Sequence, residues 1–305
     1  MRNAFIGRIM ELARKDERIC LVVGDLGFSV VEPFINEFPD RFLNAGVAEQ
    51  SMIGIATGWS IADNKIIFVY SLANFPTLRC LEQIRNDCCG HKADVKIISL
   101  GSGITYGQSG YSHFAVEDLA VMGAMPGMTI LTPADPYESG KCAELAVSTP
   151  GPVYIRLAKN GEPRLKDSDY FFGDGSFVEY KPGKDVCLIG AGNILSECLG
   201  AARMLEGDVS VSVIGLPVFK PLREDTLADL LNKFSFVFTV EEHSSYGGLA
   251  SVIGEIIARD KLSPRLVKFS LPEGFDKIGP QNDLRRLCGL TSGQIAGRIR
   301  EAVVK

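Results

Sequence analysis

The chain has 305 residues, of which 46% are hydrophobic, and its formal net charge at pH 7 is −5. A chain of this length and composition can bury two cores of ordinary size, so two domains are expected. The net negative charge, with acidic and basic residues interspersed, excludes the basic surface that binding to nucleic acid requires. Small molecules or other proteins are therefore the expected partners.

The N-terminal segment is typical of an amphipathic helix and not of a targeting signal. Its sequence, MRNAFIGRIMELARKDE, contains acidic residues, which secretory signal peptides avoid. No apolar run along the chain approaches the roughly twenty residues that span a bilayer. The eight cysteines fall mostly within apolar periodic segments and form no Cys-x-x-Cys pair. These features predict a cytoplasmic protein with reduced thiols and no membrane association.

Short apolar runs alternate with helical patterns through the first half of the chain. The runs have the length of strands, and the apolar residues between them recur at helical spacing. This alternation is typical of an α/β fold with a mostly parallel sheet covered by helices on both faces. The expected strands are 19–24, 65–70, 95–100, 128–131 and 152–157, and the expected helices are 49–62, 75–88, 116–123 and 136–148.

The composition changes between residues 159 and 184. This segment, KNGEPRLKDSDYFFGDGSFVEYKPGK, is dense in Gly, Pro, Asp and Lys, which is typical of a domain boundary. We therefore predict a first domain at 1–165, a linker at 166–184 and a second, smaller α/β domain at 185–305. In the second domain the expected strands are 186–190, 209–215, 236–241 and 265–270, and the expected helices are 195–205, 224–232, 248–259 and a closing helix from 291.

Two glycine motifs resemble phosphate sites but lack essential parts. GAGN at 190–193 follows an expected strand, yet it lacks the third glycine of the dinucleotide-binding fingerprint. GDG at 173–175 resembles the start of a magnesium–diphosphate motif, yet it lies in the linker and no asparagine follows at the expected distance. A plain turn explains the GDG segment better. We therefore expect this chain to have no phosphate cradle of its own.

Glu49 stands out because it joins an extended apolar segment to a helix of small residues, in FLNAGVAEQSMIGIATGW (42–59). An acidic residue at such a place commonly caps a helix, because it accepts hydrogen bonds from the free N–H groups of the first turn. On that interpretation the carboxylate has only a structural role. The residues around Glu49 do not by themselves decide between capping and chemistry.

Long blocks of the sequence resemble the transketolase group of thiamine diphosphate enzymes. The matching segments are NAGVAEQSMIGIATGWS, SGYSHFAVEDLAVMGAMPGMTILTPADPYE followed by GPVYIRL, and, in the second domain, VIGLPVFKPL, TVEEHSSYGGLAS and CGLTSGQIAGRI. The chain resembles the C-terminal subunit of a split transketolase. The resemblance implies a pyrimidine-binding domain followed by a transketolase C-terminal domain, with the diphosphate-binding domain on a separate polypeptide.

The resemblance also implies roles for three residues. In this family the glutamate that matches Glu49 hydrogen-bonds a ring nitrogen of the cofactor pyrimidine and favours the imino form, which removes the thiazolium C2 proton. A dry, apolar setting strengthens such a hydrogen bond. Phe75 matches the aromatic residue that stacks on the aminopyrimidine. His113 matches a histidine near the thiazolium and the donor carbonyl, and histidine suits proton transfer near neutral pH.

The segment GSGITYGQSGYSH, residues 101–113, departs from the family pattern at two positions. Gly101 replaces a histidine that usually contacts the substrate phosphate, and Ser109 replaces an aspartate that usually contacts a donor hydroxyl. Arg156 matches a family arginine that contacts phosphate, although an arginine at a strand end can equally form a structural ion pair. The candidate substrate-binding residues are therefore Ser109, His113 and Arg156. His243 matches a loop of the C-terminal domain for which we assign no chemistry.

Residues and resemblance together predict a transketolase-type transferase subunit that moves a two-carbon ketol unit between sugar-type substrates. The implied cofactors are thiamine diphosphate and Mg²⁺, held mainly by an N-terminal partner subunit in an α2β2 assembly around a homodimer core. One alternative is a related enzyme, such as a 2-oxo-acid decarboxylase or dehydrogenase β subunit or a deoxyxylulose-phosphate-synthase-like enzyme. The other is a non-catalytic regulatory partner, against which the presence of both Glu49 and His113 argues. The Ala-Glu-Gln form and EEHSSYGG favour transketolase over the 2-oxo-acid dehydrogenases.

Overall fold

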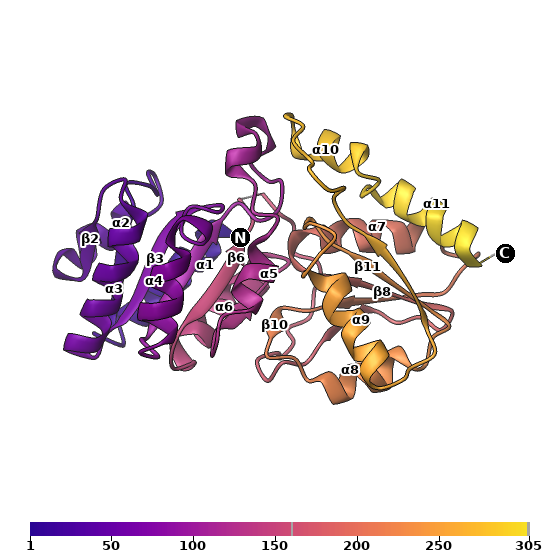
Figure 1. Cartoon of the computed structure of the whole chain (residues 1–305), viewed down its shortest axis with the longest axis horizontal. Helices are drawn as coiled ribbons and strands as arrows, with labels where there is room; N and C mark the ends of the chain where they lie inside the picture. Colours follow the sequence, from indigo (N-terminus) through magenta and orange to yellow (C-terminus); the bar gives the residue numbers. More distant parts are fainter. Residues whose placement is uncertain (160, 304–305) are drawn as a thin grey trace.

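The computed structural model describes residues 1–159 and 161–303. They form two α/β units that lie side by side, one from each half of the chain (Figure 1). Both units have a mostly parallel sheet, which confirms the fold class expected from the sequence. Within the described residues, no helix combines the length and the apolar character needed to cross a bilayer.

The first sheet has seven strands in the order β10-β5-β6-β4-β3-β1-β2. All its neighbouring strands are parallel except β10 and β5. Strands β1, β4 and β6 are buried along their whole length, as expected where helices cover both faces of a parallel sheet. The strands are β1 (Ile19–Val23), β2 (Phe42–Asn44), β3 (Ile66–Leu72), β4 (Val95–Leu100), β5 (Thr129–Leu131), β6 (Val153–Leu157) and β10 (Val218–Lys220).

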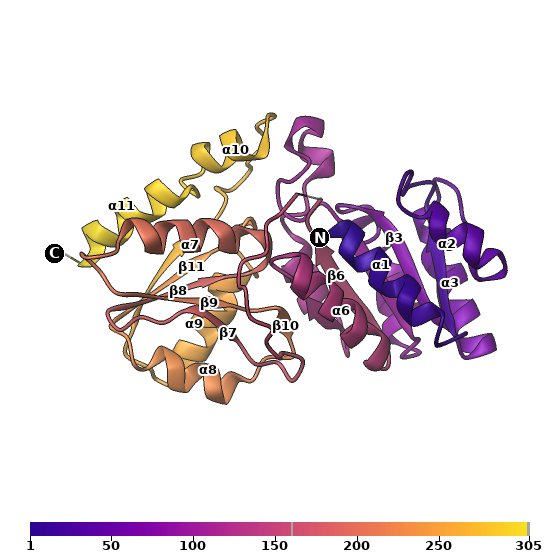
Figure 2. The same ribbon diagram turned by 180° about the vertical axis from the view of Figure 1, so that it is seen from behind.

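Helices cover both faces of this sheet. α1 (Arg2–Ala13) packs against α6 (Pro136–Ser148), and Figure 2 shows the two helices next to each other. α3 (Glu49–Asp63) packs on β3 from the other face. The shorter helices are α2 (Glu32–Glu37) and α5 (Asp118–Gly123). α6 begins where the sequence predicts, because Asp135 accepts a hydrogen bond from the Glu138 N–H at 2.8 Å and Pro136 occupies the first helical position.

The helix expected at 75–88 is broken in the structure. Its parts are a turn around Phe75, a 3₁₀ turn at Leu78–Cys80, the short α4 at Leu81–Gln83 and a π-helical turn at Ile84–Cys89. Cys88 is buried against α3, where its sulfur lies 3.1 Å from the Thr57 hydroxyl. The break leaves Phe75 in a turn at the end of β3 and not on a helix face.

The second sheet has five strands in the order β12-β11-β8-β9-β7, all parallel except the β7–β9 pair. α7 (Leu195–Met204) packs against α11 (Ser292–Val303), and α8 (Glu224–Leu231) packs against α9 (Leu249–Arg259). α10 (Gln281–Leu287) lies near the junction with the first unit (Figure 1). The strands are β7 (Val178–Lys181), β8 (Val186–Gly190), β9 (Val211–Gly215), β11 (Phe236–Val240) and β12 (Arg265–Phe269).

Two strands depart from the boundary that the composition suggested: one lies inside the expected linker and the other crosses to the first sheet. β7 lies within the expected linker, 166–184, yet it forms an edge of the second sheet. β10 follows that linker in sequence, yet it pairs antiparallel with β5 and forms an edge of the first sheet. Lys220 on β10 also donates hydrogen bonds to the carbonyls of Gly123 and Met125, at 2.7 and 2.9 Å. The first sheet therefore takes an edge strand from the second half of the chain.

The buried carboxylate of Glu138, on α6, accepts hydrogen bonds from the segment that connects the two units. One of its oxygens accepts hydrogen bonds from the hydroxyls of Tyr170, at 3.0 Å, and Tyr180, and the other accepts the Ala134 N–H at 2.7 Å. Tyr180 lies on β7, so this cluster connects the first unit to the second sheet. Burial raises the pKa of Glu138 to about 7.

The raised pKa of Glu138 predicts a pH dependence of stability. The folded protein retains a proton on Glu138 that the unfolded chain loses above its usual pKa of 4.5. The stabilising contribution is therefore complete below pH 4.5 and is lost as the pH rises through 7. At about 1.36 kcal/mol per pKa unit, the free energy of unfolding falls by on the order of 3 kcal/mol from this group.

Urea unfolding between pH 4.5 and 8 measures this dependence. We expect Glu138→Gln to flatten the decline by the share of Glu138. The pKa of Glu241 is also raised to about 7 by burial, so Glu241 still contributes to the pH dependence of stability in the variant. A variant that retains the full slope of the parent protein would show that Glu138 is not the titrating group.

Candidate functional site

The residues singled out from the sequence come together at one edge of the first sheet. Strands β2, β1, β3 and β4 are neighbours and run parallel, so the segments that follow them meet at their carboxyl ends. Glu49 begins the helix after β2, Phe75 lies in the turn after β3, and His113 lies in the loop after β4. This edge is where an open parallel sheet places its ligand sites.

Glu49 is the first residue of α3 and is 3% exposed. Both of its carboxylate oxygens lie 3.0 Å from Nη1 of Arg79. The hydrogen bonds of this carboxylate in the described residues go to that guanidinium and not to the free N–H groups of α3, which argues against a capping role. Gly24 and Met52 pack beside it, since a Cβ on Gly24 would lie 3.7 Å from Cγ of Glu49 and 3.3 Å from the Met52 sulfur.

Three further side chains form a chain of contacts that starts at this carboxylate. The guanidinium carbon of Arg79 lies 4.3 Å from the centroid of the Phe75 ring, in a cation–π contact. The Phe75 and His113 rings meet edge to face, with their centroids 5.2 Å apart. The Arg79 side chain is 49% exposed, and the rings of Phe75 and His113 are half-buried. We call Glu49, Phe75, Arg79 and His113 the Glu49 cluster. Sequence reasoning found three of its members and missed Arg79.

His113 ends a 3₁₀ turn, Tyr111–His113, in the loop that follows β4. The Ser112 hydroxyl lies 3.0 Å from Nδ1 of His113. Ser109 lies earlier in the same loop, on the exposed 3₁₀ turn Gly107–Ser109. The loop therefore carries both residues, with the imidazole against Phe75 and the Ser109 side chain at the surface.

The second unit holds this loop in place. Glu242 is buried, and its carboxylate accepts hydrogen bonds from the Ile104 N–H at 3.2 Å, from Gln281 at 2.9 and 3.0 Å, and from Arg285. Gly103 has a φ of +61°, and a Cβ there would lie 2.3 Å from Oε2 of Glu242, so this contact requires glycine. Figure 1 shows the loop next to α10, which carries Gln281 and Arg285. The C-terminal domain thus helps to set the position of His113.

Arg156 lies in the structural ion pair that the sequence left as an alternative. It is 2% exposed, and its Nε lies 2.6 Å from Oδ2 of Asp118. Its Nη2 donates hydrogen bonds to the carbonyls of Ala115 and Glu242, both at 2.9 Å. These contacts connect β6 with the start of α5 and with the second unit. They favour a structural role for Arg156 over a contact with substrate.

The EEHSSYGG block forms a junction between the units. Glu241 accepts hydrogen bonds from the Leu249 and Ala250 N–H groups, at 2.6 and 3.0 Å, and so caps α9. His243 is buried, and its Nε2 lies 3.4 Å from the Ala120 backbone nitrogen. Burial lowers the pKa of His243 and keeps the imidazole neutral. The geometry gives these residues structural contacts at the junction.

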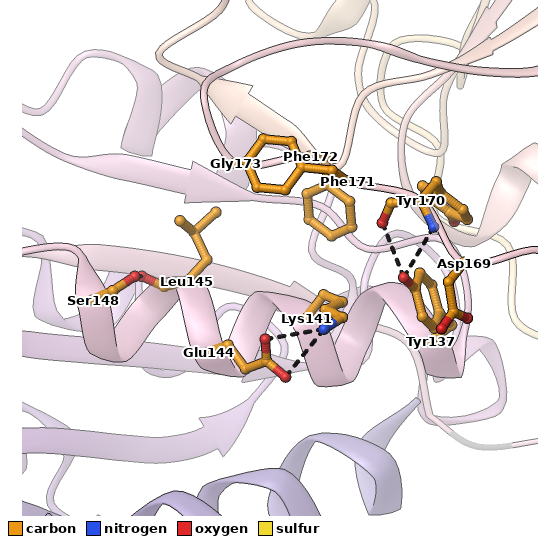
Figure 3. A pocket seen from close by; sticks show the side chains of 10 residues that line it. All are labelled: Tyr137, Lys141, Glu144, Leu145, Ser148, Asp169, Tyr170, Phe171, Phe172 and Gly173. Atoms are coloured by element: carbon orange, nitrogen blue, oxygen red, sulfur yellow. Dashed lines mark hydrogen bonds and ion pairs between the residues drawn. The ribbon is translucent and has the colours of Figure 1, made fainter.

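A surface cavity of about 760 Å³ lies away from this cluster, between α6 and residues 169–173 (Figure 3). Tyr137 and Tyr170 lie at one end of it, and the Tyr137 hydroxyl bonds to the Tyr170 N–H and carbonyl, at 3.1 and 2.9 Å. Phe171, which is 82% exposed, lies over its middle. The residues that line it include none of the candidate site residues.

The GDG turn is engaged in local contacts. Asp174 accepts a hydrogen bond from the Ser176 N–H at 3.1 Å and forms an ion pair with Arg223 at 3.1 Å. Among the described residues, no group of three or more His, Cys, Asp and Glu side chains is arranged to hold a metal ion. The candidate site is therefore the Glu49 cluster.

Two known family domains match this chain. The transketolase pyrimidine binding domain matches residues 1–162, and the transketolase C-terminal domain matches residues 175–295. The chain belongs to the transketolase family. This confirms the resemblance inferred from the sequence.

Two relatives and one solved structure cover nearly the whole chain. A putative transketolase C-terminal section from Methanocaldococcus jannaschii is 33% identical over 100% of this chain and 96% of its own length. A 6-deoxy-6-sulfo-D-fructose transketolase subunit from Clostridium sp. (strain MSTE9) is 30% identical over 99% of this chain and 94% of its own length. The structure of a split gene transketolase, described as an inactive β4 tetramer, has a TM-score of 0.87 and 32% identity, covering 99% of this chain and 97% of that one. Transketolases built from separate sections or subunits are thus similar to this chain over its full length.

Proposed function

We propose that this chain is the C-terminal subunit of a split transketolase and that Glu49 activates the aminopyrimidine of thiamine diphosphate. The observation that carries the proposal is a buried carboxylate placed next to an aromatic ring and an imidazole at the carboxyl edge of a parallel sheet. Membership of the transketolase family supports the reaction class. The full-length similarity to split and sectioned transketolases supports the division into subunits.

The Glu49 cluster fits the pyrimidine half of this cofactor. A carboxylate accepts a hydrogen bond from a protonated ring nitrogen, and the Phe75 ring supplies an apolar face for stacking. No comparable fit exists for the diphosphate at the GDG turn, because Asp174 is engaged by Ser176 and Arg223. We therefore assign the diphosphate and Mg²⁺ to the N-terminal partner subunit.

The side chains of this chain divide the proton chemistry between them. When bound, thiamine diphosphate supplies the nucleophilic carbon that attacks a donor carbonyl. Glu49 holds a proton at the pyrimidine nitrogen, and its burial strengthens that hydrogen bond relative to the same bond in water. His113, half-buried beside Phe75, moves protons to and from the substrate oxygen.

The division into subunits predicts the behaviour of the purified chain. Alone, it should be inactive and bind thiamine diphosphate weakly, because the diphosphate groups lack their partners. The related split transketolase structure, described as an inactive β4 tetramer, is in keeping with this expectation. Mixing with a partner subunit that carries a diphosphate-binding domain, sought first in the neighbouring open reading frame, should create ketol-transfer activity.

Calorimetry of cofactor binding, with and without Mg²⁺ and with and without the partner, shows which subunit binds the diphosphate. The Glu49→Gln chain is the control: it should assemble with the partner yet give no activity. Tight, magnesium-dependent binding of thiamine diphosphate to the isolated chain would overturn the assignment of the diphosphate to the partner.

We further propose that the substrate carries an anionic group other than the terminal phosphate of common ketoses. Gly101 has a φ of +101°, and a Cβ there would lie 2.2 Å from the Tyr106 ring, so no side chain fits where other family members place a phosphate-binding histidine. Arg156 is buried in its ion pair, and Ser109 has no charge to offer. Related subunits are named for a sulfonated sugar and for apulose 4-phosphate, and neither name is that of xylulose 5-phosphate.

Steady-state assays of the assembled enzyme test this specificity. Each missing polar contact is worth roughly 1–3 kcal/mol, and two together are on the order of 4 kcal/mol, or two to three powers of ten at about 1.4 kcal/mol per decade. We expect kcat/KM for xylulose 5-phosphate to be lower by that factor than in transketolases that retain both contacts, and an unphosphorylated or sulfonated ketose to be the better donor. A value for xylulose 5-phosphate of about 10⁴ M⁻¹s⁻¹ or higher would contradict the proposal. Pyruvate as the preferred donor would indicate the deoxyxylulose-phosphate-synthase-like alternative instead.

A further inference from the structure

Arg79 lies at the place where the proposed function requires a ligand. Its Nη1 lies 3.0 Å from both oxygens of the Glu49 carboxylate, and its guanidinium carbon lies 4.3 Å from the centroid of the Phe75 ring. The planar cation thus contacts a carboxylate at its edge and an aromatic ring with its π system. These are the two contacts that an aminopyrimidine hydrogen-bonded to Glu49 and stacked on Phe75 would make.

We propose that Arg79 is a gate of the aminopyrimidine site, and that its guanidinium leaves the space between Glu49 and Phe75 when the cofactor binds. This inference rests on the proposed function of Glu49 and Phe75. It adds a residue that the motifs of the chain do not indicate.

The ion pair and the cofactor compete for the same atoms. A carboxylate buried to the extent of Glu49 needs a partner, because an unpaired buried charge is strongly unfavourable. Arg79 supplies that partner in the chain by itself. A pyrimidine nitrogen that bonds to Glu49 must displace at least part of this contact, since both of the carboxylate oxygens already face Nη1.

The exposure of the two partners makes the exchange feasible. Arg79 is 49% exposed, whereas the Glu49 side chain is 4% exposed. A half-exposed guanidinium regains hydration when it moves outward, and the bound pyrimidine replaces it as the partner of the buried carboxylate. Its position on the 3₁₀ turn Leu78–Cys80, outside the regular helix, leaves the long side chain free to turn toward solvent. Glu49 stays in place while Arg79 moves.

The gate predicts that removal of the guanidinium strengthens pyrimidine binding. The probe is 4-amino-5-hydroxymethyl-2-methylpyrimidine, which lacks the diphosphate and therefore does not depend on the partner subunit. We expect the full chain with Arg79→Gln to bind this probe about tenfold more tightly than the parent chain, as measured by calorimetry. Arg85→Gln, which removes the same charge from an exposed position in the next turns, should leave the affinity unchanged.

A second measurement follows Arg79 itself. In the parent chain, the NMR signal of the Arg79 guanidinium should shift toward that of free arginine when the probe saturates the site, and Glu49→Gln should produce the same shift without probe. Thermal unfolding checks that each variant is folded. If Arg79→Gln does not fold, Arg79→Lys, which keeps the charge but loses the planar stacking group, should bind the probe more tightly than the parent.

The outcomes separate the gate from the proposed function. Equal or weaker probe binding by Arg79→Gln would contradict the proposed gate. So would an NMR signal of the Arg79 guanidinium that does not shift when the probe is added. The function of Glu49 would survive that result if Glu49→Gln loses the probe. Probe binding that does not change in Glu49→Gln, or no probe binding by any variant, would overturn both the site and the gate.

Discussion

The burial of one carboxylate, that of Glu49, is the constraint on which the site depends. Strand β2 ends at the carboxyl edge of the sheet, and α3 begins with Glu49 five residues later. This connection leaves the acid 3% exposed among Gly24, Met52 and the turn after β3. A charge in such a place must be paired, and the partner is either a side chain of the protein or a group on a ligand. Arg79 is the partner in this structure, and we propose the cofactor pyrimidine as the partner in the loaded enzyme.

The second unit contributes to the site by holding a loop. Glu242 from the second unit accepts the Ile104 N–H, and its carbonyl accepts a hydrogen bond from Arg156. The loop that carries His113 thus contacts β6 through Arg156, which donates to the Ala115 carbonyl, and packs against α10. The strand β10 comes from the second half of the chain and forms an edge of the first sheet, which ties the two units together. Similarity to the transketolase family extends over both domains, 1–162 and 175–295.

Much of this architecture follows from local patterns, and the exceptions have physical causes. α6 was predictable to the residue because Asp135 and Pro136 mark its start. β10 was not, because three residues at a sheet edge, paired across the domain boundary, carry no periodic signal. The segment 75–88 has helical spacing, but packing of Cys88 against Thr57 accompanies a wider turn that spacing alone does not reveal.

Phe75 was found only through the family resemblance. Arg79 was missed because its ion pair with Glu49 spans thirty residues that no local pattern connects.

The central claim, that Glu49 activates the cofactor, is tested most directly by the exchange of the C2 proton of bound thiamine diphosphate. The assembled enzyme, loaded with cofactor in deuterated buffer and quenched at intervals, gives the exchange rate by NMR. The account predicts rapid exchange in the parent enzyme. It predicts slowing by at least about two powers of ten in Glu49→Gln, the scale of a lost general acid–base contribution. Exchange in the variant as fast as in the parent, with cofactor bound and the subunits assembled, would contradict the account.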